Sequence, residues 1–254
     1  MGSIAPHTRV AIVTGSAQGI GRSIALRLAE DGLNVVINDI PAKAAQIEEA
    51  VAEIKAKSGV KVIAAPADVT NEEAVQAMIA SVVEQLGSLD VMVANAGVMS
   101  YGPLVLVPSE EWDRVININL RGVMLCYKYA AKQMIEQGRG GRIIGASSMA
   151  GRHGMPYTSA YAASKFAIRG LTQSLASELA KDNITVNVYA PGAIRTNIVS
   201  LEDAKAQGLS GSALSKIPIA EPEVIASLVS YIAKPEAYFI TGQTISANGG
   251  AHFD

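Results

Sequence analysis

The sequence predicts an α/β fold: a single doubly wound Rossmann-type domain, with a seven-stranded parallel sheet and helices on both faces. Short runs rich in valine and isoleucine alternate along the chain with longer segments of helical periodicity. Several of these runs are apolar at every position, as strands buried on both faces are. No repeat, linker or low-complexity segment divides the 254 residues. We therefore expect one domain spanning 1–254.

The expected strands are the short apolar runs themselves, and each is followed by a helical pattern or by the end of the chain. They are RVAIVT (9–14), LNVVIN (33–38), VKVIAA (60–65), LDVMVA (89–94), GRIIGA (141–146), ITVNVY (184–189) and QTISA (243–247). The helical patterns cover 19–31, 42–58, 71–86, 109–136, 159–181 and 221–233. Helix-start signals agree with these limits, because acidic residues follow Asn71 and Ser109 and a proline stands at 222.

The segment at about 193–220 interrupts this alternation. It is rich in Gly, Ser and Ala, lacks a clear strand, and follows the expected sixth strand. Ligands of open α/β sheets bind at the carboxyl ends of the strands, so a long insertion there is interpreted as a substrate lid. The alternative is a surface excursion with no role in binding.

Composition narrows the classes of partner and compartment. With 21 basic and 23 acidic side chains the net charge is −2, which gives no electrostatic reason to expect nucleic acid or an anionic membrane as partner. No apolar run approaches eighteen residues, and the N-terminus lacks the pattern of a signal peptide. The single cysteine, Cys126, lies in an apolar helical stretch and is interpreted as a core residue. A cytoplasmic protein without a catalytic metal is expected, because three scattered histidines and one cysteine offer no ligand spacing.

A glycine-rich turn, TGSAQGIG, follows the first strand and opens the first helix. Gly15, Gly19 and Gly21 give the spacing G-x-x-x-G-x-G, with Gln18 and Ile20 beside them. Such a turn brings backbone amides at a helix N-terminus close to a pyrophosphate. Turns of this kind also serve only to pack a strand on a helix, but the position after the first strand favours a dinucleotide site.

Asp39 ends the second strand, eighteen residues after Gly21. A carboxylate there accepts hydrogen bonds from ribose hydroxyls and repels a 2′-phosphate. No basic residue lies in the glycine turn or directly after Asp39. The sequence therefore predicts NAD as cofactor, the alternative being a solvated carboxylate without a role.

Tyr161 and Lys165 stand four residues apart in YAASK, thirteen and seventeen positions after Ser148. An i, i+4 pair shares one helix face. An ammonium beside a phenol lowers the pKa of the phenol, so Tyr161 is a candidate proton donor and acceptor, with Ser148 to polarise a carbonyl oxygen. Without their context, the pair is ordinary surface packing and the serine a turn residue.

The turn TGSAQGIG, the NAG at 95–97, Asn119, Ser148, YAASK and the PGAIRT at 191–196 occur in an order that resembles the short-chain dehydrogenase/reductase superfamily over essentially the whole chain. The resemblance implies that Tyr161 exchanges the proton, that Lys165 also holds the nicotinamide ribose, and that Asn119 orients a relay water. It favours Ser148 over Ser147. The remaining cofactor contacts it implies are Asp68, Val69, Asn95, Ala96, Gly97, Pro191, Gly192, Ile194 and Thr196. Read alone, the alternatives are that Asp68 caps the helix at 71–86 and that NAG is an ordinary strand-end turn.

Within that superfamily the stretch 161–196 is most similar to acetoin and diacetyl reductases, which implies a small alcohol or ketone substrate. Met149 and Met155 stand where that group has polar residues, which makes an apolar secondary alcohol or cyclic ketone equally suitable. His153 and Tyr157 are further candidates for the substrate pocket. The resemblance also implies a homotetramer, with the helices near 109–136 and 159–181 at one interface.

Two alternatives stay open at this point. A 3-oxoacyl-thioester reductase would share every catalytic motif, but that group generally prefers NADPH, and Leu125 and Ser177 occupy the positions where it docks its acidic partner. A nucleotide-sensing protein on the same fold would need none of the four catalytic side chains.

Overall fold

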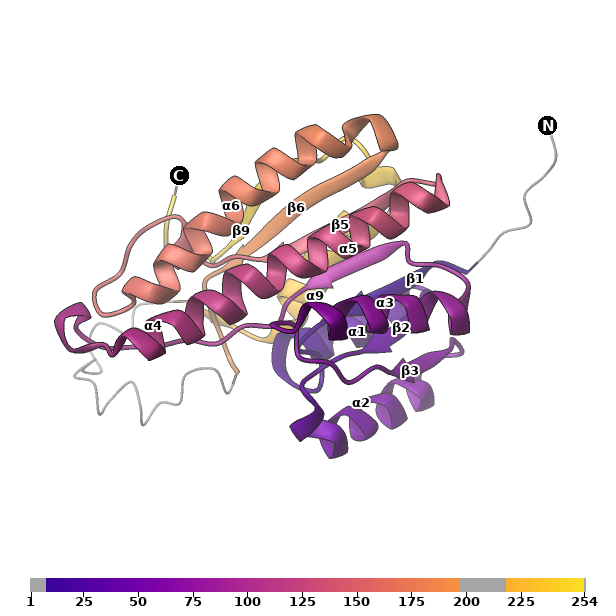
Figure 1. The fold of residues 1–254 in the computed structure, drawn as a ribbon, viewed down its shortest axis with the longest axis horizontal. Helices are drawn as coiled ribbons and strands as arrows, with labels where there is room; N and C mark the ends of the chain where they lie inside the picture. Colours follow the sequence, from indigo (N-terminus) through magenta and orange to yellow (C-terminus); the bar gives the residue numbers. More distant parts are fainter. Residues whose placement is uncertain (1–7, 197–217, 254) are drawn as a thin grey trace.

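The computed structural model describes residues 8–196 and 218–253, and its centre is a seven-stranded parallel sheet (Figure 1). The order is β3-β2-β1-β4-β5-β6-β9, and every neighbouring pair is parallel. The strands are β1 Val10–Val13, β2 Asn34–Ile37, β3 Val62–Ala64, β4 Val91–Ala94, β5 Gly141–Ala146, β6 Ile184–Pro191 and β9 Thr244–Ala247. Each falls on one of the predicted runs, and the predicted doubly wound fold is confirmed.

Helices cover both faces of the sheet. On one face α1, α2 and α9 bury the apolar side chains of alternate strand positions, and on the other α3, α5 and α6 do so (Figure 1). The main helices are α1 Gly19–Glu30, α2 Ala44–Lys57, α3 Glu72–Leu86, α4 Ser109–Ile116, α5 Gly122–Gln137, α6 Ser159–Leu179 and α9 Pro222–Ala233. Strands β1, β4 and β6 are buried along their whole length, which accounts for their lack of apolar-polar alternation.

All three predicted helix-start signals mark the start of a helix. The Asn71 side chain accepts a hydrogen bond of 2.9 Å from the backbone N–H of Ala74 and caps α3. Pro222 is the first residue of α9, where its missing N–H costs nothing. Ser109 is the first helical residue of α4 rather than its cap, since Pro108 precedes the helix.

The helix expected over 109–136 contains a feature that its periodicity does not predict. Between α4 and α5 the residues Asn117–Arg121 form a π-helical turn. One extra residue in a helical turn alters which side chains face the sheet, and such turns frequently occur at functional sites. This one carries Asn119.

The expected lid at about 193–220 lies mostly outside the described residues, so it stays a prediction. Of this segment the structure describes only the two ends, where β7 Ala193–Ile194 pairs in parallel with β8 Ile219–Ala220. Within 8–196 and 218–253, no helix combines the length and apolarity needed to cross a membrane. No group of three His, Cys, Asp or Glu side chains in these ranges is arranged to hold a metal. Cys126 is buried in the core, as interpreted.

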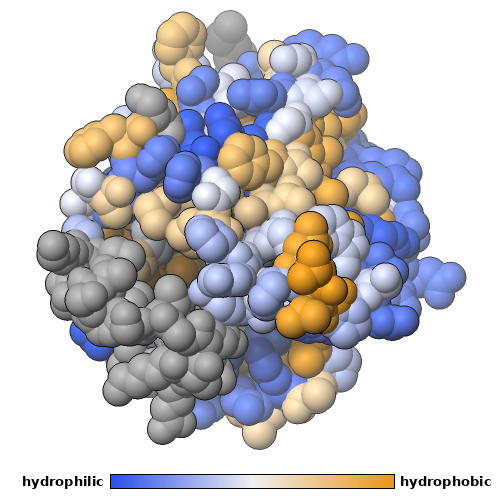
Figure 2. All heavy atoms as spheres, turned by 90° about the vertical axis from the view of Figure 1, so that its left-hand side faces the viewer, coloured by the Kyte–Doolittle hydropathy of each residue, from blue (hydrophilic) through white to orange (hydrophobic). Residues whose placement is uncertain are grey.

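The surface around α4 carries an unusual group of apolar side chains. The 3-10 turn Leu104–Leu106, which precedes α4, exposes 59%, 90% and 74% of its three side chains in order. Figure 2, which faces the end of the molecule that carries α4, shows one compact group of strongly apolar side chains on a mainly polar surface. This turn follows the segment that leaves the carboxyl end of β4.

Candidate active site

A cleft of about 640 Å³ opens at the carboxyl ends of the strands, where the chain order reverses between β1 and β4. Every residue predicted to bind the cofactor lines this cleft. They are Gly15, Gln18, Gly19, Ile20, Gly21, Asp39, Asp68, Val69, Asn95, Ala96, Gly97, Tyr161, Lys165, Pro191, Gly192, Ile194 and Thr196. Ser148 lines it too. Segments as far apart in the sequence as Gly15 and Thr196 are thus brought to one cavity of ligand-binding size.

The glycine turn leaves backbone amides directed at the cleft. Gly15 and Gly19 adopt φ values of +63° and +59°, a region that favours glycine. A Cβ on Gly15 would come within 2.8 Å of the Ala96 Cα, so the turn also needs glycine for its close approach to NAG. Helix α1 begins at Gly19 and has neither a side-chain cap nor an acidic first turn. Its first N–H groups therefore form a site for an anion.

Thr14 and Tyr189, which were not predicted from the sequence, help to fix this turn to the NAG segment at 95–97. Asn95 Nδ2 donates to the carbonyl oxygens of Thr14 and Gly15, at 2.8 and 3.1 Å, and the Tyr189 hydroxyl donates to Asn95 Oδ1 at 2.7 Å. Thr14 Oγ1 accepts from the backbone N–H of Asn95 and Ala96, both at 3.0 Å. Because these contacts join β1, β4 and β6, only the tertiary structure discloses them.

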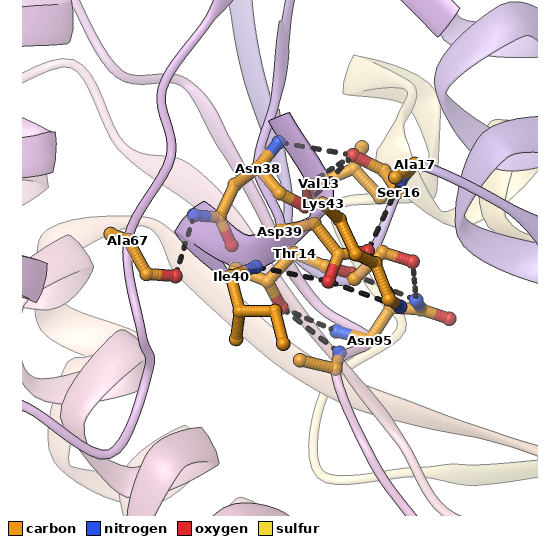
Figure 3. A network of polar contacts seen from close by, with 12 residues as sticks. Val13, Thr14, Ser16, Ala17, Asn38, Asp39, Ile40, Lys43, Ala67 and Asn95 are labelled. Atoms are coloured by element: carbon orange, nitrogen blue, oxygen red, sulfur yellow. Dashed lines mark hydrogen bonds and ion pairs between the residues drawn. The ribbon is translucent and has the colours of Figure 1, made fainter. Parts of the chain in front are cut away.

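Asp39 is the second residue after β2, 7% exposed, and lies in the polar network of Figure 3. Its Oδ2 accepts from the Ala17 N–H at 3.3 Å, and its Oδ1 accepts from the Ile40 N–H at 3.0 Å. Lys43 lies 3.3 Å from Oδ1 and completes an i, i+4 ion pair that also lines the cleft. Lys43 was not predicted from the sequence, because it does not directly follow Asp39, although its i, i+4 spacing was the available signal.

Asn38 supplies an observation that fits a bound ligand. Its Nδ2 donates to the carbonyl oxygens of Ala65 and Ala67, while its Oδ1 is buried and has no hydrogen-bond partner among the described residues. Asn38 lines the cleft. A buried acceptor without a donor is costly, so this orphaned oxygen, the free amides of α1 and the Asp39 carboxylate together fit a dinucleotide.

Asp68 and Val69 lie at the same end of the cleft, after β3. The Asp68 carboxylate accepts from the N–H and hydroxyl of Thr70, at 2.9 and 2.8 Å. It does not cap α3, because Asn71 does so. The alternative interpretation of Asp68 as a helix cap is therefore excluded.

Tyr161 and Lys165 stand in the first two turns of α6 and face the cleft. The Lys165 ammonium donates to the Ala146 carbonyl at 2.8 Å and lies 5.4 Å from the centroid of the Tyr161 ring. Ser148 follows β5 and shares a hydrogen bond with Tyr161. Ser147 is buried and donates instead to the Lys165 carbonyl at 3.1 Å, which agrees with the choice of Ser148 as the polarising serine.

The expectation that Lys165 lowers the pKa of Tyr161 is wrong for the chain alone. Burial raises the pKa of the Tyr161 phenol above its usual 10, and the hydrogen bond from Ser148 only partly offsets this. Burial also lowers the pKa of Lys165 to about 8. The cost of desolvating both groups therefore exceeds the benefit of placing them on one helix face.

Asn119 does not line the cleft and lies behind its wall. From the π-helical turn its Oδ1 accepts from the Val98 N–H at 2.8 Å, and its Nδ2 donates to the Val98 carbonyl at 2.8 Å and to Ser164 Oγ at 3.2 Å. A Cβ on Gly97 would come within 3.2 Å of Asn119 Oδ1 and 3.5 Å of Lys165 Nζ. Asn119 thus anchors the strand end that passes beside Lys165.

The other residues predicted for the substrate pocket lie beyond Ser148, outside the lining of the cleft. Met149 and Met155 are half-buried, and His153 is exposed and stacks on His252 with ring centroids 5.4 Å apart. Tyr157, with φ of +67°, packs against Tyr101 at 5.6 Å. Its carbonyl accepts from the Gly102 N–H at 2.8 Å, which joins this loop to the segment before Leu104–Leu106. Their contact with a substrate stays a prediction.

Comparison with known proteins gives matches over most of the chain. A family model described as short chain dehydrogenase matches residues 9–207. A short-chain dehydrogenase/reductase of Armillaria gallica is 49% identical over 255 residues, 97% of each chain. A 3-oxoacyl-acyl-carrier-protein reductase of Staphylococcus aureus is 46% identical over 248 residues, 96% of this chain and 98% of that protein. The crystal structure of acetoin dehydrogenase YohF from Salmonella typhimurium is similar with a TM-score of 0.84, 35% identity and 96% of each chain covered.

Proposed function

The chain belongs to the short-chain dehydrogenase family, and on that premise we propose that it is an oxidoreductase that transfers a hydride between NAD(H) and a secondary alcohol or its ketone. The observation that carries the proposal is the convergence of Ser148, Tyr161 and Lys165 on one wall of the cleft that the glycine turn opens. The hydroxyl pair Ser148 and Tyr161 offers hydrogen bonds to one oxygen atom, as reduction of a carbonyl requires.

Each side chain has a separate task. When bound, the nicotinamide supplies or accepts the hydride. Tyr161 gives its proton to the developing alkoxide, or takes it in the oxidative direction, and Ser148 holds the same oxygen. Lys165, with a pKa of about 8, is largely an ammonium at neutral pH and favours the phenolate once Tyr161 has lost its proton. Asn119, through Val98, holds the strand end beside Lys165.

The cofactor assignment rests on Asp39. Its carboxylate lies at the end of the cleft beyond the glycine turn and repels a 2′-phosphate, so we propose NAD(H) as the preferred cofactor. The groups that would hold the cofactor are the amides of Gly19, Ile20 and Gly21 for the pyrophosphate and the side chains of Asp39 and Lys165 for the two riboses.

The substrate is proposed to be an acetoin- or diacetyl-like compound or an apolar ketone. Similarity to a solved acetoin dehydrogenase supports the first class. Met149, Met155 and the Tyr101–Tyr157 pair support the second, because Met149, Met155 and Tyr157 follow Ser148 in the chain and Tyr101 packs against Tyr157, so the loop after Ser148 carries apolar and aromatic groups. A screen of NADH oxidation with diacetyl, acetoin, cyclic ketones and acetoacetyl thioesters distinguishes these classes.

The decisive test of the reaction is Tyr161→Phe. Loss of the phenolic hydroxyl is expected to lower kcat at least about 100-fold, the range for removal of a general acid, while NADH still binds. Binding is followed by the fluorescence of NADH and turnover by its absorbance. Retained turnover in the variant would contradict the proton-transfer role. A wild-type protein that binds NADH but turns over no carbonyl compound would favour a nucleotide sensor.

A second candidate is reduction of a 3-oxoacyl thioester. The 46% identical relative from Staphylococcus aureus carries that name, and this favours the candidate. Asp39 opposes it through the expected NAD preference. Leu125, at one of the expected partner-docking positions, is fully buried and offers no surface to a carrier protein. Turnover of the acetoacetyl thioester above that of every simple ketone would establish this candidate.

A further inference from the structure

Lys43 is held between the two oxygens of the Asp39 carboxylate. Its Nζ lies 3.3 Å from Oδ1 and 3.4 Å from Oδ2, and both side chains line the cleft (Figure 3). Lys43 ends the 3-10 turn Pro41–Lys43 that leads from β2 into α2. The pair therefore lies in the connection between β2 and α2, at the carboxyl end of the second strand.

The carboxylate has no acceptor capacity to spare in this arrangement. An ionised carboxyl group has about four lone-pair sites. The Ile40 N–H occupies one on Oδ1, the Ala17 N–H occupies one on Oδ2, and the Lys43 ammonium lies against the rest. The two N–H donors belong to backbone turns that the fold fixes. Lys43 is 30% exposed on a flexible stem, so it is the donor that can leave.

NAD(H) and NADP(H) would interact differently with the Asp39–Lys43 pair. A ribose with free 2′- and 3′-hydroxyls needs two acceptor sites on Asp39, so its binding competes with Lys43. A ribose with a 2′-phosphate needs fewer acceptor sites and brings a negative charge of nearly two beside an ammonium that can rotate toward it. Asp39 repels that phosphate and Lys43 attracts it, and the observed affinity reflects both.

The other basic side chains that line the cleft already have partners of their own. Arg114 forms a bidentate pair with Glu111, at 2.7 and 2.8 Å. Arg195 pairs with Glu221 at 2.8 Å. Lys165 is buried beside Tyr161. Lys43 is therefore the cation of this cleft wall placed to meet a phosphate next to Asp39.

We propose that Lys43 is a specificity-determining residue that narrows the preference of this chain for NAD(H) and lets it bind NADP(H). The inference rests on the proposed function, because it assumes that the cleft binds a dinucleotide. Lys43 is expected to raise the affinity for NADP(H) and to leave unchanged or lower the affinity for NAD(H), without taking part in turnover.

The test is the affinity of the full chain for NADH and NADPH, measured by calorimetric titration without substrate. In Lys43→Met the dissociation constant of NADPH is expected to rise about tenfold, the loss of one charge-assisted contact. That of NADH is expected to stay equal or fall, because no ammonium competes for Asp39. Lys57→Met is the matched control, since Lys57 forms an i, i+4 pair with Glu53 on α2, outside the cleft.

A double-variant cycle isolates the pair. Asp39→Asn removes the repulsion and is expected to increase NADPH affinity at least tenfold, and Asp39→Asn with Lys43→Met is expected to lose most of that gain. Equal changes for NADH and NADPH in Lys43→Met, or a gain in Asp39→Asn that survives loss of Lys43, would overturn the inference while leaving the proposed function intact. Failure of the wild-type protein to bind either nucleotide would overturn both.

Discussion

At the residue scale, the chain buries the ammonium of the candidate active-site residue Lys165 in a place where charge is unfavourable. Lys165 is 3% exposed, and the only hydrogen bond of its Nζ among the described residues goes to the Ala146 carbonyl. A neutral carbonyl compensates poorly for lost hydration, which is why burial lowers the Lys165 pKa to about 8. The fold thus bears a cost at this position for a group that its proposed chemistry needs.

This cost predicts a pH-dependent stability. The usual pKa of lysine is 10.5, so between pH 8 and 10.5 the unfolded chain binds more protons at Lys165 than the folded chain does. The free energy of unfolding therefore rises with pH across that window, and the cost is fully present below it. Relative to Lys165→Met, the wild-type protein is expected to gain about 2 kcal/mol between pH 8 and 10, measured by urea unfolding.

This prediction needs a control variant and an upper limit of pH. Lys55→Met, at an exposed position of α2, is the matched variant. Burial raises the pKa of Tyr161, so above pH 10 the unfolded chain loses that proton first and stability falls, which sets the end of the range. A wild-type stability that runs parallel to that of Lys165→Met from pH 8 to 10 would contradict the buried ammonium.

At the element scale, the turn between β1 and α1 depends on close backbone contact. A Cβ on Gly21 would lie 2.4 Å from the Gly15 carbonyl oxygen and 2.6 Å from Asn95 Nδ2. The neighbouring atom is backbone that β1 holds in place, so the helix must move away from the turn. Gly21→Ala is expected to lower the free energy of unfolding by about 2 kcal/mol and to weaken NADH binding at least tenfold.

Thermal unfolding and NADH fluorescence titration check both parts of this prediction. Gly59→Ala is the control, because a Cβ at Gly59 meets nothing within 4 Å. NADH affinity within twofold of wild type in Gly21→Ala would show that the geometry of this turn is not what presents the amides to the ligand.

Some elements of the fold could be predicted from the sequence and others could not. Strands such as Val91–Ala94 were predictable because burial on both faces imposes an unbroken apolar run, and the glycine turn because only glycine tolerates its geometry. The π-helical turn at Asn119 was not, since one additional residue in a helix leaves no periodic signal over five positions. Tyr189 could not be predicted because its partner Asn95 lies at the end of a distant strand, whereas Lys43 could have been found from its i, i+4 spacing to Asp39.

At the scale of the whole molecule, the exposed face of α6 is unusual for a surface in contact with water. It carries no charged side chain from its first turn until Glu178, apart from the half-buried Arg169 and the buried Lys165. Before Glu178 the exposed positions are Ala163, Phe166, Gly170, the adjacent pair Gln173 and Ser174, and Ser177, so that an exposed residue recurs every three or four positions. Small and apolar residues in a stripe suit close packing of two copies, and isologous contacts of this kind build tetramers with two-fold axes. We propose that this face contributes to a homotetramer.

Phe166→Glu tests that assembly. Phe166 is 41% exposed and stacks with Arg169, so the substitution leaves the core of one chain intact but places two carboxylates, one from each copy, at a desolvated contact. Wild type is expected to elute with four times the mass of one chain in size-exclusion chromatography with light scattering, and the variant with a smaller multiple.

Tyr238→Glu, at a position 70% exposed beyond α9, is the control for a change of charge on a different face. A wild-type protein that is monomeric at micromolar concentration, or a Phe166→Glu variant of unchanged mass, would place the interface elsewhere. Because the stripe begins two residues from Tyr161 on the same helix, loss of assembly is also expected to reduce turnover in the variant more than its NADH affinity.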